Sequence, residues 1–460
     1  MTHNQPPPQM PSAKRLPLIG SGPFMLRDPL AFFQQAQQEK GDIYELDLGL
    51  TKIIVLNHPR HAQHILVDKL HNYEKGGALW DRFRDMLGNG LTVSQGDFWK
   101  RQRRMMQPYF HQRQIGLLAE RMVDVIDTEM DKWAVDQAEF DVQQAMTRIT
   151  MRITVSTLFG MGLSEAEIER ASSTFTYVIE SLIPGMVTSA LPAWLPLPSR
   201  RRYHAELANI RDLISTLIER GRSGDGDPNS MLAMLIEATD AITGDQMTDE
   251  QLVDEVINFF AAGYETTAVA LTWACQYLTQ QPDILTTMRA EVDAAVGERL
   301  PTMQDLRQLP YTRRVLQETL RIRPPSYNTP RMAVEDDEID GYGIPSGTMI
   351  LLITYIMHRH PEQWPKPETF DPNRFLVERE IDANGQPRHK LAWMPFGAGQ
   401  RMCIGKEFAL MEGTLVLARL AQRFDMGAIA GKVAKPRPSA TLQPKDGVFV
   451  KLSNRLKTNK

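Results

Sequence analysis

The sequence predicts a mainly α-helical protein with small β-sheets. Apolar residues recur at the spacing of one helical face over long stretches, which favours helices. Shorter runs of alternating or β-branched residues stand next to turn signals such as Gly341-Tyr342-Gly343, which favours short strands at the edge of a helical body. No internal repeat is found in the 460 residues.

The expected elements follow a mixed order along the chain. Strand-like runs come first, helical periodicity dominates the middle, and strand-like runs return near the end. The strand-like runs are 43–48, 52–56, 348–354 and 448–452, and the clearest helical stretches are 117–133, 144–159, 203–220 and 253–278. The polar stretch 222–230 is expected to be an exposed loop.

Residues 1–18 form a polar, proline-rich tail with no apolar stretch long enough for a signal peptide or a membrane span. Residues 19–460 are expected to form a single domain. A net charge of −4 argues against general binding to nucleic acid. The chain has two cysteines far apart, so a disulfide framework is not expected and a reducing, cytoplasmic location follows. Cys275, in an apolar helix, is interpreted as a small buried hydrophobe.

Residues 396–405 (Phe-Gly-Ala-Gly-Gln-Arg-Met-Cys-Ile-Gly) are suited to surround a thiolate ligand of haem iron. Cys403 supplies the thiolate. Gly399 and Gly405 lack a Cβ, so the backbone can turn tightly and approach a flat macrocycle. Phe396 is expected to cover the sulfur, and Arg401 to reach a haem propionate. The helical run that begins at Gly405 directs its N-terminal N–H groups at the sulfur and lowers the thiol pKa.

The pattern Phe-x-x-Gly-x-Arg-x-Cys-x-Gly resembles that of the cytochrome P-450 haem-thiolate monooxygenases, and the resemblance extends over nearly the whole chain. It implies the P-450 fold, with a long central helix (the I helix) and a cysteine-ligand loop before the last long helix. It also implies one haem b, dioxygen as co-substrate and no bound flavin. Because the chain carries no flavin or iron–sulfur module, electrons are expected from an external ferredoxin and an NAD(P)H-dependent ferredoxin reductase. The lack of a membrane anchor suggests a soluble, bacterial enzyme.

A second motif lies in a helix that starts with a capping box at Thr248 and ends before Pro282. Within this apolar run stands Ala-Gly-Tyr-Glu-Thr-Thr, residues 262–267, where a charged side chain is costly and calls for an explanation. It is similar to the I-helix motif of the P-450 family. The resemblance implies that Ala262 and Gly263 leave room for dioxygen and a water, that Thr266 hydrogen-bonds the bound oxygen, and that Glu265 relays protons.

Three further groups match the family's order of motifs. Trp99 and Arg103, one helical turn apart, and Arg331 are expected to bind the haem propionates. A network of Glu318, Arg321 and Arg374 is expected to hold the cysteine-bearing segment in register and to take no part in chemistry. The cations Lys100, Arg101, Arg104 and Lys406 are expected to form a basic patch that docks the acidic electron donor, the alternative being a solvated charge run. His111 and His358 have no motif and are interpreted as structural.

The substrate is expected to be an apolar small molecule: a terpenoid, a steroid or a fatty acid. The family places specificity in variable segments, here 79–87, 182–195, the residues just before Ala262, 326–329 and 440–444. By resemblance, the apolar, proline-interrupted segment 183–198 is expected to form a flap over the substrate entrance, the alternative being ordinary packing beneath a loop. Candidate pocket residues are Trp80, Phe83, Met86, Leu87, Phe259, Ser326, Tyr327 and Leu442. Only Lys52, or Arg82 in its place, is available to hold a fatty-acid carboxylate.

The main hypothesis is a monooxygenase that inserts one atom of dioxygen into a C–H bond. Two alternatives remain. A fatty-acid peroxygenase of the same fold is disfavoured because such relatives tend to lose the acid–alcohol pair that Glu265 and Thr266 retain. A haem-based ligand sensor has no need of a proton relay or an electron-donor surface. A zinc site at Cys403 lacks the further cysteine and histidine ligands that zinc requires.

Overall fold

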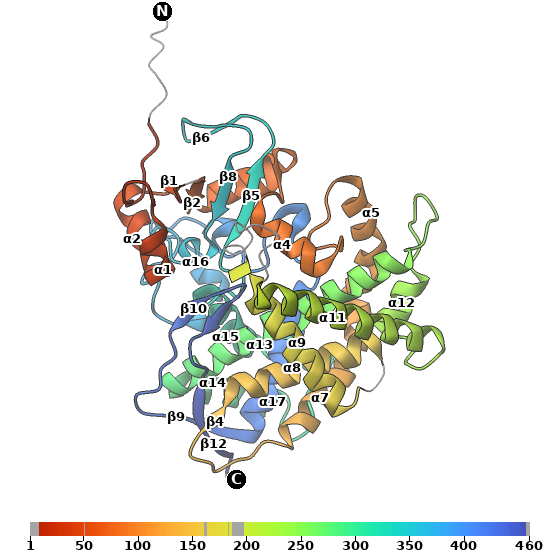
Figure 1. The fold of residues 1–460 in the computed structure, drawn as a ribbon. Helices are drawn as coiled ribbons and strands as arrows, with labels where there is room; N and C mark the ends of the chain where they lie inside the picture. Colours follow the sequence, from red (N-terminus) through yellow and green to blue (C-terminus); the bar gives the residue numbers. More distant parts are fainter. Residues whose placement is uncertain (1–8, 50, 161–162, 183, 186–196, 457–460) are drawn as a thin grey trace, which may run out of the picture. The chain divides into compact units, whose positions relative to one another are not determined.

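The computed structural model describes residues 9–49, 51–160, 163–182, 184–185 and 197–456. The chain divides into two compact units; Figure 1 labels their helices and strands. The first unit comprises Met1–Trp80 and Leu320–Cys403, and the second comprises Asp81–Thr319 and Ile404–Lys460. The single domain expected from residue 19 onward stays a prediction. No helix in the described ranges is long and apolar enough to cross a membrane.

The first unit is built on a five-stranded sheet of order β1-β2-β8-β5-β3. Strands β2 and β8 pair in parallel and the other neighbours are antiparallel. Its strands are β1 (Ile43–Asp47), β2 (Lys52–Leu56), β3 (Tyr73–Glu74), β5 (Thr329–Ala333) and β8 (Met349–Leu352), with the hairpin β6 (Asp337–Ile339) and β7 (Tyr342–Ile344). Its helices are α1 (Gly22–Arg27), α2 (Pro29–Lys40), α3 (Pro59–Gln63) and α16 (Thr354–Met357). Leu56, Ile350 and Leu352 are fully buried at the centre of its core.

The second unit is mostly helical. Its helices are α4 (Ala78–Leu87), α5 (Gly96–Met106), α6 (Gln112–Leu117), α7 (Ala119–Met130), α8 (Val142–Phe159), α9 (Glu165–Glu180), α11 (Pro198–Arg222), α12 (Met231–Glu237), α13 (Asp249–Gln280), α14 (Pro282–Ala295), α15 (Pro310–Ile322) and α17 (Lys406–Arg423), of which α4 and α15 continue into the first unit. Its strands are β4 (Phe140–Asp141), β9 (Phe424–Ala428) and β12 (Phe449–Asn454) in one sheet, and the hairpin β10 (Pro436–Pro438) and β11 (Leu442–Pro444). The predicted class, mainly α with small sheets, is confirmed.

Helix α13 organises the second unit (Figure 1). It begins with the predicted capping box, in which Thr248 and Gln251 satisfy each other's main-chain N–H groups, and it ends before Pro282 after 32 residues. It packs against α8, α11, α12, α14, α17 and strands β9 and β11. Phe260 of α13 lies 4.6 Å from the ring centre of Phe175 in α9, so an aromatic contact helps to hold the helices together.

Helix α13 also holds the loop of residues 88–92, which joins α4 to α5. Three side chains of α13 each accept a hydrogen bond from a main-chain N–H of this loop: Asp254 from Asn89 at 2.7 Å, Glu255 from Leu91 at 2.9 Å and Asn258 from Thr92 at 3.2 Å. Gly88 has φ +63°, and a Cβ there would lie 2.0 Å from the Asp254 carboxylate. Burial raises the pKa of Glu255 to about 8. The close approach of Gly88 to Asp254 therefore requires glycine.

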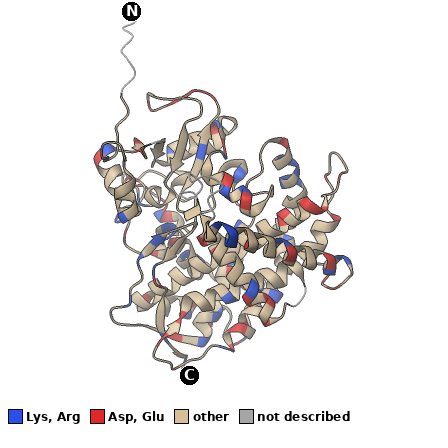
Figure 2. Cartoon of the chain, viewed as in Figure 1, with Lys and Arg blue, Asp and Glu red and all other residues tan. Residues whose placement is uncertain are grey.

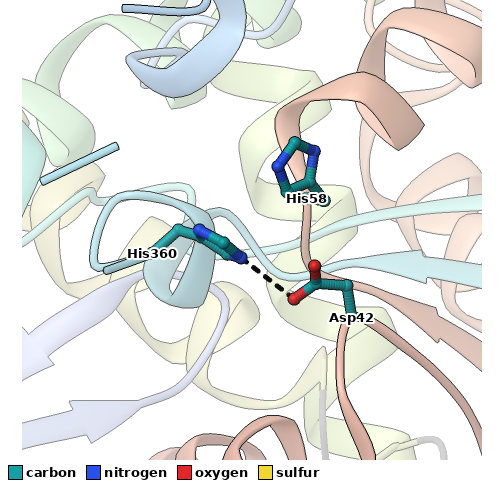
Figure 3. A group of neighbouring side chains, drawn as sticks. All are labelled: Asp42, His58 and His360. Atoms are coloured by element: carbon teal, nitrogen blue, oxygen red, sulfur yellow. Dashed lines mark hydrogen bonds and ion pairs between the residues drawn. The ribbon is translucent and has the colours of Figure 1, made fainter. Parts of the chain in front are cut away.

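Asp42, His58 and His360 gather where β1, α3 and the segment after α16 meet in the first unit (Figure 3). The His360 Nε2 lies 3.0 Å from a carboxylate oxygen of Asp42. His58 Nδ1 accepts the Arg60 main-chain N–H, so its Nε2 carries the proton and donates to Glu362 at 3.2 Å. With both ring nitrogens of His58 engaged in this way, the cluster is a hydrogen-bonded junction and leaves His58 no lone pair for a metal ion.

Candidate functional site

The cysteine loop of the first unit folds back on itself. The main-chain N–H of Cys403 donates to the Phe396 carbonyl at 2.9 Å, and that of Met402 donates to the Gly399 carbonyl at 3.1 Å. The Cys403 side chain is exposed, whereas Cys275 in α13 is fully buried and its burial raises the pKa of its thiol to about 12. Cys403 therefore stands where the two ends of the loop meet, with its side chain exposed.

Gly399 shows why this loop needs glycine. Its φ is +66°, and a Cβ there would lie 2.0 Å from the carbonyl oxygen of Leu66. Gly397 has φ +70°, but a Cβ at that position would meet no atom within 4 Å, so it carries the same backbone cost without the clash. The loop thus rests directly against the backbone of residues 64–68 in the same unit.

We expect Gly399→Ala to destabilise the protein more than Gly397→Ala. Both changes place a side chain at positive φ, which costs about 1–2 kcal/mol, and only the first also forces the loop away from Leu66. Thermal unfolding followed by circular dichroism compares the two variants. Equal losses in Tm would contradict the close approach of the loop to Leu66.

Arg331 of β5 is a buried cation that fits the role of a propionate ligand. Its side chain is 5% exposed, and burial lowers the pKa of its guanidinium to about 10. Its Nη1 donates to the Pro330 carbonyl at 2.8 Å, and in the described part of the chain no carboxylate pairs with it. A buried guanidinium without an anion is costly, so the residues here fit a group that brings carboxylates, as haem does.

Arg321 and Arg374 converge on the carbonyl groups of residues 365–369 in the first unit. Arg321 donates to Pro367 O at 2.8 Å and Arg374 to Lys366 O at 2.7 Å. Glu318, fully buried, precedes Arg321 by one turn of α15 and belongs to the second unit. The structural network expected of these three residues stays a prediction, with its two arginines bound to one loop.

His358 is a residue whose importance the sequence did not indicate. It is fully buried, its Nδ1 lies 3.0 Å from the Arg321 carbonyl, and its Nε2 accepts the main-chain N–H of Met394 at 2.9 Å. It therefore connects the end of α15 to the segment that leads into the cysteine loop. No short motif surrounds it, because both of its partners are main-chain groups.

In the second unit, the acid–alcohol pair lies at the middle of α13. Thr266 Oγ1 donates to the Ala262 carbonyl at 3.0 Å, the back-bond expected of a threonine in a helix. Ala262 is exposed, but Gly263 faces α8, where a Cβ would lie 3.1 Å from Thr154 Oγ1. The space beside this motif is thus at Ala262. The smallness of Gly263, which we expected to make room for dioxygen, allows α13 and α8 to approach.

Glu265 turns toward the β10–β11 hairpin. Its Oε1 accepts hydrogen bonds from Thr441 Oγ1 at 2.8 Å and Gln443 Nε2 at 3.1 Å. Burial raises the pKa of the Glu265 carboxyl, and these two hydrogen bonds oppose the rise by favouring the charged form. A carboxyl held under these opposing influences is suited to take up and give up a proton.

Trp99 and Arg103 of α5 line one hollow of about 370 Å³, together with Lys100, Arg104 and His111. Trp99 is 7% exposed, and both side chains project to the same side of α5 as their spacing indicates. The arrangement suits two donors to one anionic group.

Gly405 stands directly before α17, and its carbonyl accepts the Ala409 N–H at 2.9 Å, so the helix begins where the sequence indicates.

The cations of the expected docking patch each face an acid of the same unit. The pairs are Lys100–Asp97 at 2.9 Å, Arg101–Asp245 at 3.6 Å, Arg104–Asp240 at 2.7 Å and Lys406–Glu407 at 3.8 Å. Figure 2 likewise shows basic and acidic segments interspersed along the chain. These acids reduce the positive charge of the patch, and its docking role stays a prediction.

The candidate pocket residues differ in exposure. Met86, Leu87 and Leu442 are buried in the second unit, and Phe259 packs on Phe110 with ring centres 5.4 Å apart. In the first unit, Trp80 is buried and donates to Pro330 O, Ser326 is exposed, and burial raises the pKa of Tyr327 to about 12. Phe83 is half-buried. The segment 186–196, most of the expected flap, lies outside the described residues.

The two expected anchors for a fatty-acid carboxylate, Arg82 and Lys52, each pair with an acid. Arg82 donates to the Gly185 carbonyl at 3.0 Å and pairs with Asp85 at 3.2 Å. Lys52 pairs with Glu45 at 3.1 Å. Both cations therefore have acidic partners within their own units.

Known proteins resemble this chain over almost its full length. The family model described as "Cytochrome P450" matches residues 8–452. Cyclooctatin synthase of Streptomyces melanosporofaciens is 35% identical, covering 93% of this chain and 92% of that protein. Pentalenene oxygenase of Streptomyces avermitilis is 30% identical, covering 93% of each. The crystal structure of the cytochrome P450DA heme domain matches with a TM-score of 0.89 at 26% identity, covering 98% of this chain and 99% of that one.

The chain belongs to the cytochrome P450 family, as the motif around Cys403 and the acid–alcohol pair of α13 indicate. It is a haem-dependent monooxygenase. The exposed Cys403 thiol, the glycine-dependent loop around it and the buried Arg331 fit the haem that this family binds.

Proposed function

We propose that this P450 hydroxylates a neutral terpenoid and that Cys403 would hold the iron of a haem b through its thiolate. The relatives named cyclooctatin synthase, cyclooctat-9-en-7-ol 5-monooxygenase and pentalenene oxygenase act on terpenoids. The observation that carries the choice over a fatty acid is the pairing of both candidate anchors, Arg82 and Lys52, with acids. The substrate and dioxygen take up two electrons and two protons, giving the alcohol and one water.

The residues of this chain have distinct roles in the proposal. Arg331, Arg401, Trp99 and Arg103 would bind the haem propionates, and Phe396 would shield the Cys403 sulfur from water. When bound, haem supplies the activation of dioxygen. The small side chain of Ala262 would leave room for dioxygen. Thr266 would provide a hydroxyl beside it, and Glu265 would move protons from solvent to that position.

The electrons are proposed to come from an external ferredoxin and its NAD(P)H-dependent reductase in the bacterial cytoplasm. This part of the proposal is supported by the cations of α5 and by the cysteine usage of the chain. The ion pairs of those cations predict that docking depends on salt but is not abolished by any single charge change.

A carbon-monoxide difference spectrum of the reduced protein, with wild type beside Cys403→Ala, tests thiolate ligation. We expect the band typical of thiolate-bound haem in wild type only. The same wild-type sample is then screened with terpenoids, steroids and fatty acids for a low-to-high-spin shift. A shift with fatty acids alone, or turnover with peroxide but not with a ferredoxin chain, would overturn the terpenoid monooxygenase proposal in favour of a peroxygenase. Haem binding without any turnover would point to a ligand sensor.

A further inference from the structure

The carboxyl group of Glu265 is held from outside its own helix. Both of its hydrogen-bond donors, Thr441 and Gln443, belong to the β10–β11 hairpin, 176 and 178 residues further along the chain. Thr441 is 7% exposed and Gln443 is 8% exposed. Two nearly buried polar side chains that converge on one carboxylate oxygen form a specific arrangement, because each is costly to bury without its partner.

The hairpin is fixed to α13 at a second point. Trp273 of α13 donates from Nε1 to the Leu442 carbonyl at 2.8 Å, and Leu442 stands between the two donors to Glu265. Trp273 and Leu442 are both fully buried. Because the strand is anchored to the helix eight residues away from Glu265, the donors keep their places when the Glu265 side chain moves.

The orientation of the Gln443 amide is set in turn by a surface ion pair. Gln443 Oε1 accepts from Arg437 Nη2 at 3.2 Å, and the same nitrogen lies 3.3 Å from Glu180. A guanidinium donates only, so the amide must direct its oxygen at Arg437 and its NH₂ at Glu265. Neither an amide nor a guanidinium passes protons at neutral pH. Gln443 therefore holds Glu265, and Arg437 orients Gln443, but neither residue conducts protons to the carboxyl.

This geometry decides which oxygen of Glu265 carries a proton. Oε1 accepts two hydrogen bonds, so a proton taken up by the carboxyl is placed on Oε2, and no partner of Oε2 is found among the described residues. We infer that Thr441 and Gln443 are positioning residues, which hold Glu265 by one oxygen so that the other is the proton-exchanging atom. The inference rests on the proposed function, in which Glu265 delivers protons beside Thr266.

The first test titrates Glu265 in the resting protein, without turnover. The infrared band of its protonated carboxyl is identified by its loss in Glu265→Gln, and its intensity is followed against pH. In Thr441→Val we expect the band to persist to higher pH, because a hydrogen bond that favoured the carboxylate is gone. Thr441→Ser restores the hydroxyl and is expected to restore the titration.

The matched control is Thr272→Val, which deletes a buried hydroxyl of α13 that donates to Ala268 O of the same helix at 2.7 Å. It is expected to leave the band unchanged. Gln443→Leu removes the other donor and is expected to act in the same direction as Thr441→Val, so the inference can be tested even when one of the two variants does not fold. A band that titrates at the same pH in wild type, Thr441→Val and Gln443→Leu overturns the positioning role.

The second test measures how reducing equivalents divide between hydroxylated product and hydrogen peroxide. Loss of one hydrogen bond to a charged group is expected to raise the peroxide-to-product ratio about tenfold in Thr441→Val. In a Glu265→Gln background the same change is expected to have no further effect. A band shift without any terpenoid turnover would leave the positioning role standing and overturn the proposed substrate; terpenoid hydroxylation without a band shift would do the reverse.

Discussion

Replacing Thr266 by alanine, or Glu265 by glutamine, is expected to lower the hydroxylated product formed per NAD(P)H about 10²-fold while substrate binding is kept. General acid–base groups typically contribute a factor of about 10²–10⁴. The Thr266 hydroxyl donates its proton to the carbonyl of the exposed Ala262 and so can still accept a hydrogen bond. Spin-shift titration measures binding, and product and hydrogen peroxide are quantified in the same reaction.

Thr267→Ala is the matched control for this prediction. Thr267 is the same residue type, one position further along α13, but it is 5% exposed and bonds to the Gly263 carbonyl at 3.4 Å. Its loss is expected to leave the ratio of product to peroxide unchanged. The acid–alcohol assignment would be wrong if Thr266→Ala and Thr267→Ala affected that ratio equally.

His358 is expected to make the protein lose stability as the solution becomes mildly acidic. Burial, aided by the charges of Arg321 and Arg359 and opposed by a hydrogen bond to the Arg321 carbonyl, brings the pKa of His358 from its usual 6.5 to about 3. Its Nε2 accepts the Met394 N–H and has no room for a second proton. The folded state therefore keeps His358 neutral at a pH where the unfolded chain takes up a proton.

This difference in proton uptake makes the free energy of unfolding fall as the pH falls. A depressed folded pKa contributes no penalty above the unfolded value of 6.5, and stability is lost as pH falls from 6.5 toward 3. The free energy of unfolding should drop by about 1.4 kcal/mol per pH unit through this one group. Carboxyl groups with lowered pKa add nothing at about pH 5–6; in Asp42, for example, hydrogen bonds from His360 and Gln37 outweigh burial and bring the pKa to about 2.

Urea unfolding of wild type and His358→Gln at several pH values measures the effect. We expect the slope of unfolding free energy against pH to be smaller in the variant by one proton. The exposed His111, changed to glutamine, serves as the control and should leave the slope as in wild type. Parallel pH profiles for wild type and His358→Gln would contradict the neutral, buried histidine.

The parts of the site that could be predicted from the sequence are those with local spacing. The capping box and Pro282 delimit α13, and strand β2 covers the residues expected, because local periodicity and turn chemistry determine such elements. The Cys403 loop was recognisable because each of its special residues lies within ten positions of the others. The helix expected at 117–133 divides into α6 and α7 at Leu118.

The parts that could not be predicted depend on contacts between distant residues. Thr441 and Glu265 have no shared pattern, and neither do Asn89 and Asp254, because a hydrogen bond between side chains or to a main-chain N–H leaves no mark on the neighbouring residues. Gly263 shows a related difficulty. Its small size was visible in the sequence. Whether this leaves room for dioxygen or for the packing of α8 depends on the direction in which position 263 of α13 faces.

The hydrogen bonds of α13 to the 88–92 loop fix the distance along this helix between the loop and the acid–alcohol pair. Asn258 grips the loop and Thr266 carries the reactive hydroxyl, so eight residues at about 1.5 Å each set an axial separation of about 12 Å. A relative of this enzyme cannot gain or lose one residue between these positions, since that change would also rotate the two groups by about 100°. Adaptation to longer or shorter substrates should therefore come from side chains and loops, with the spacing within α13 left intact.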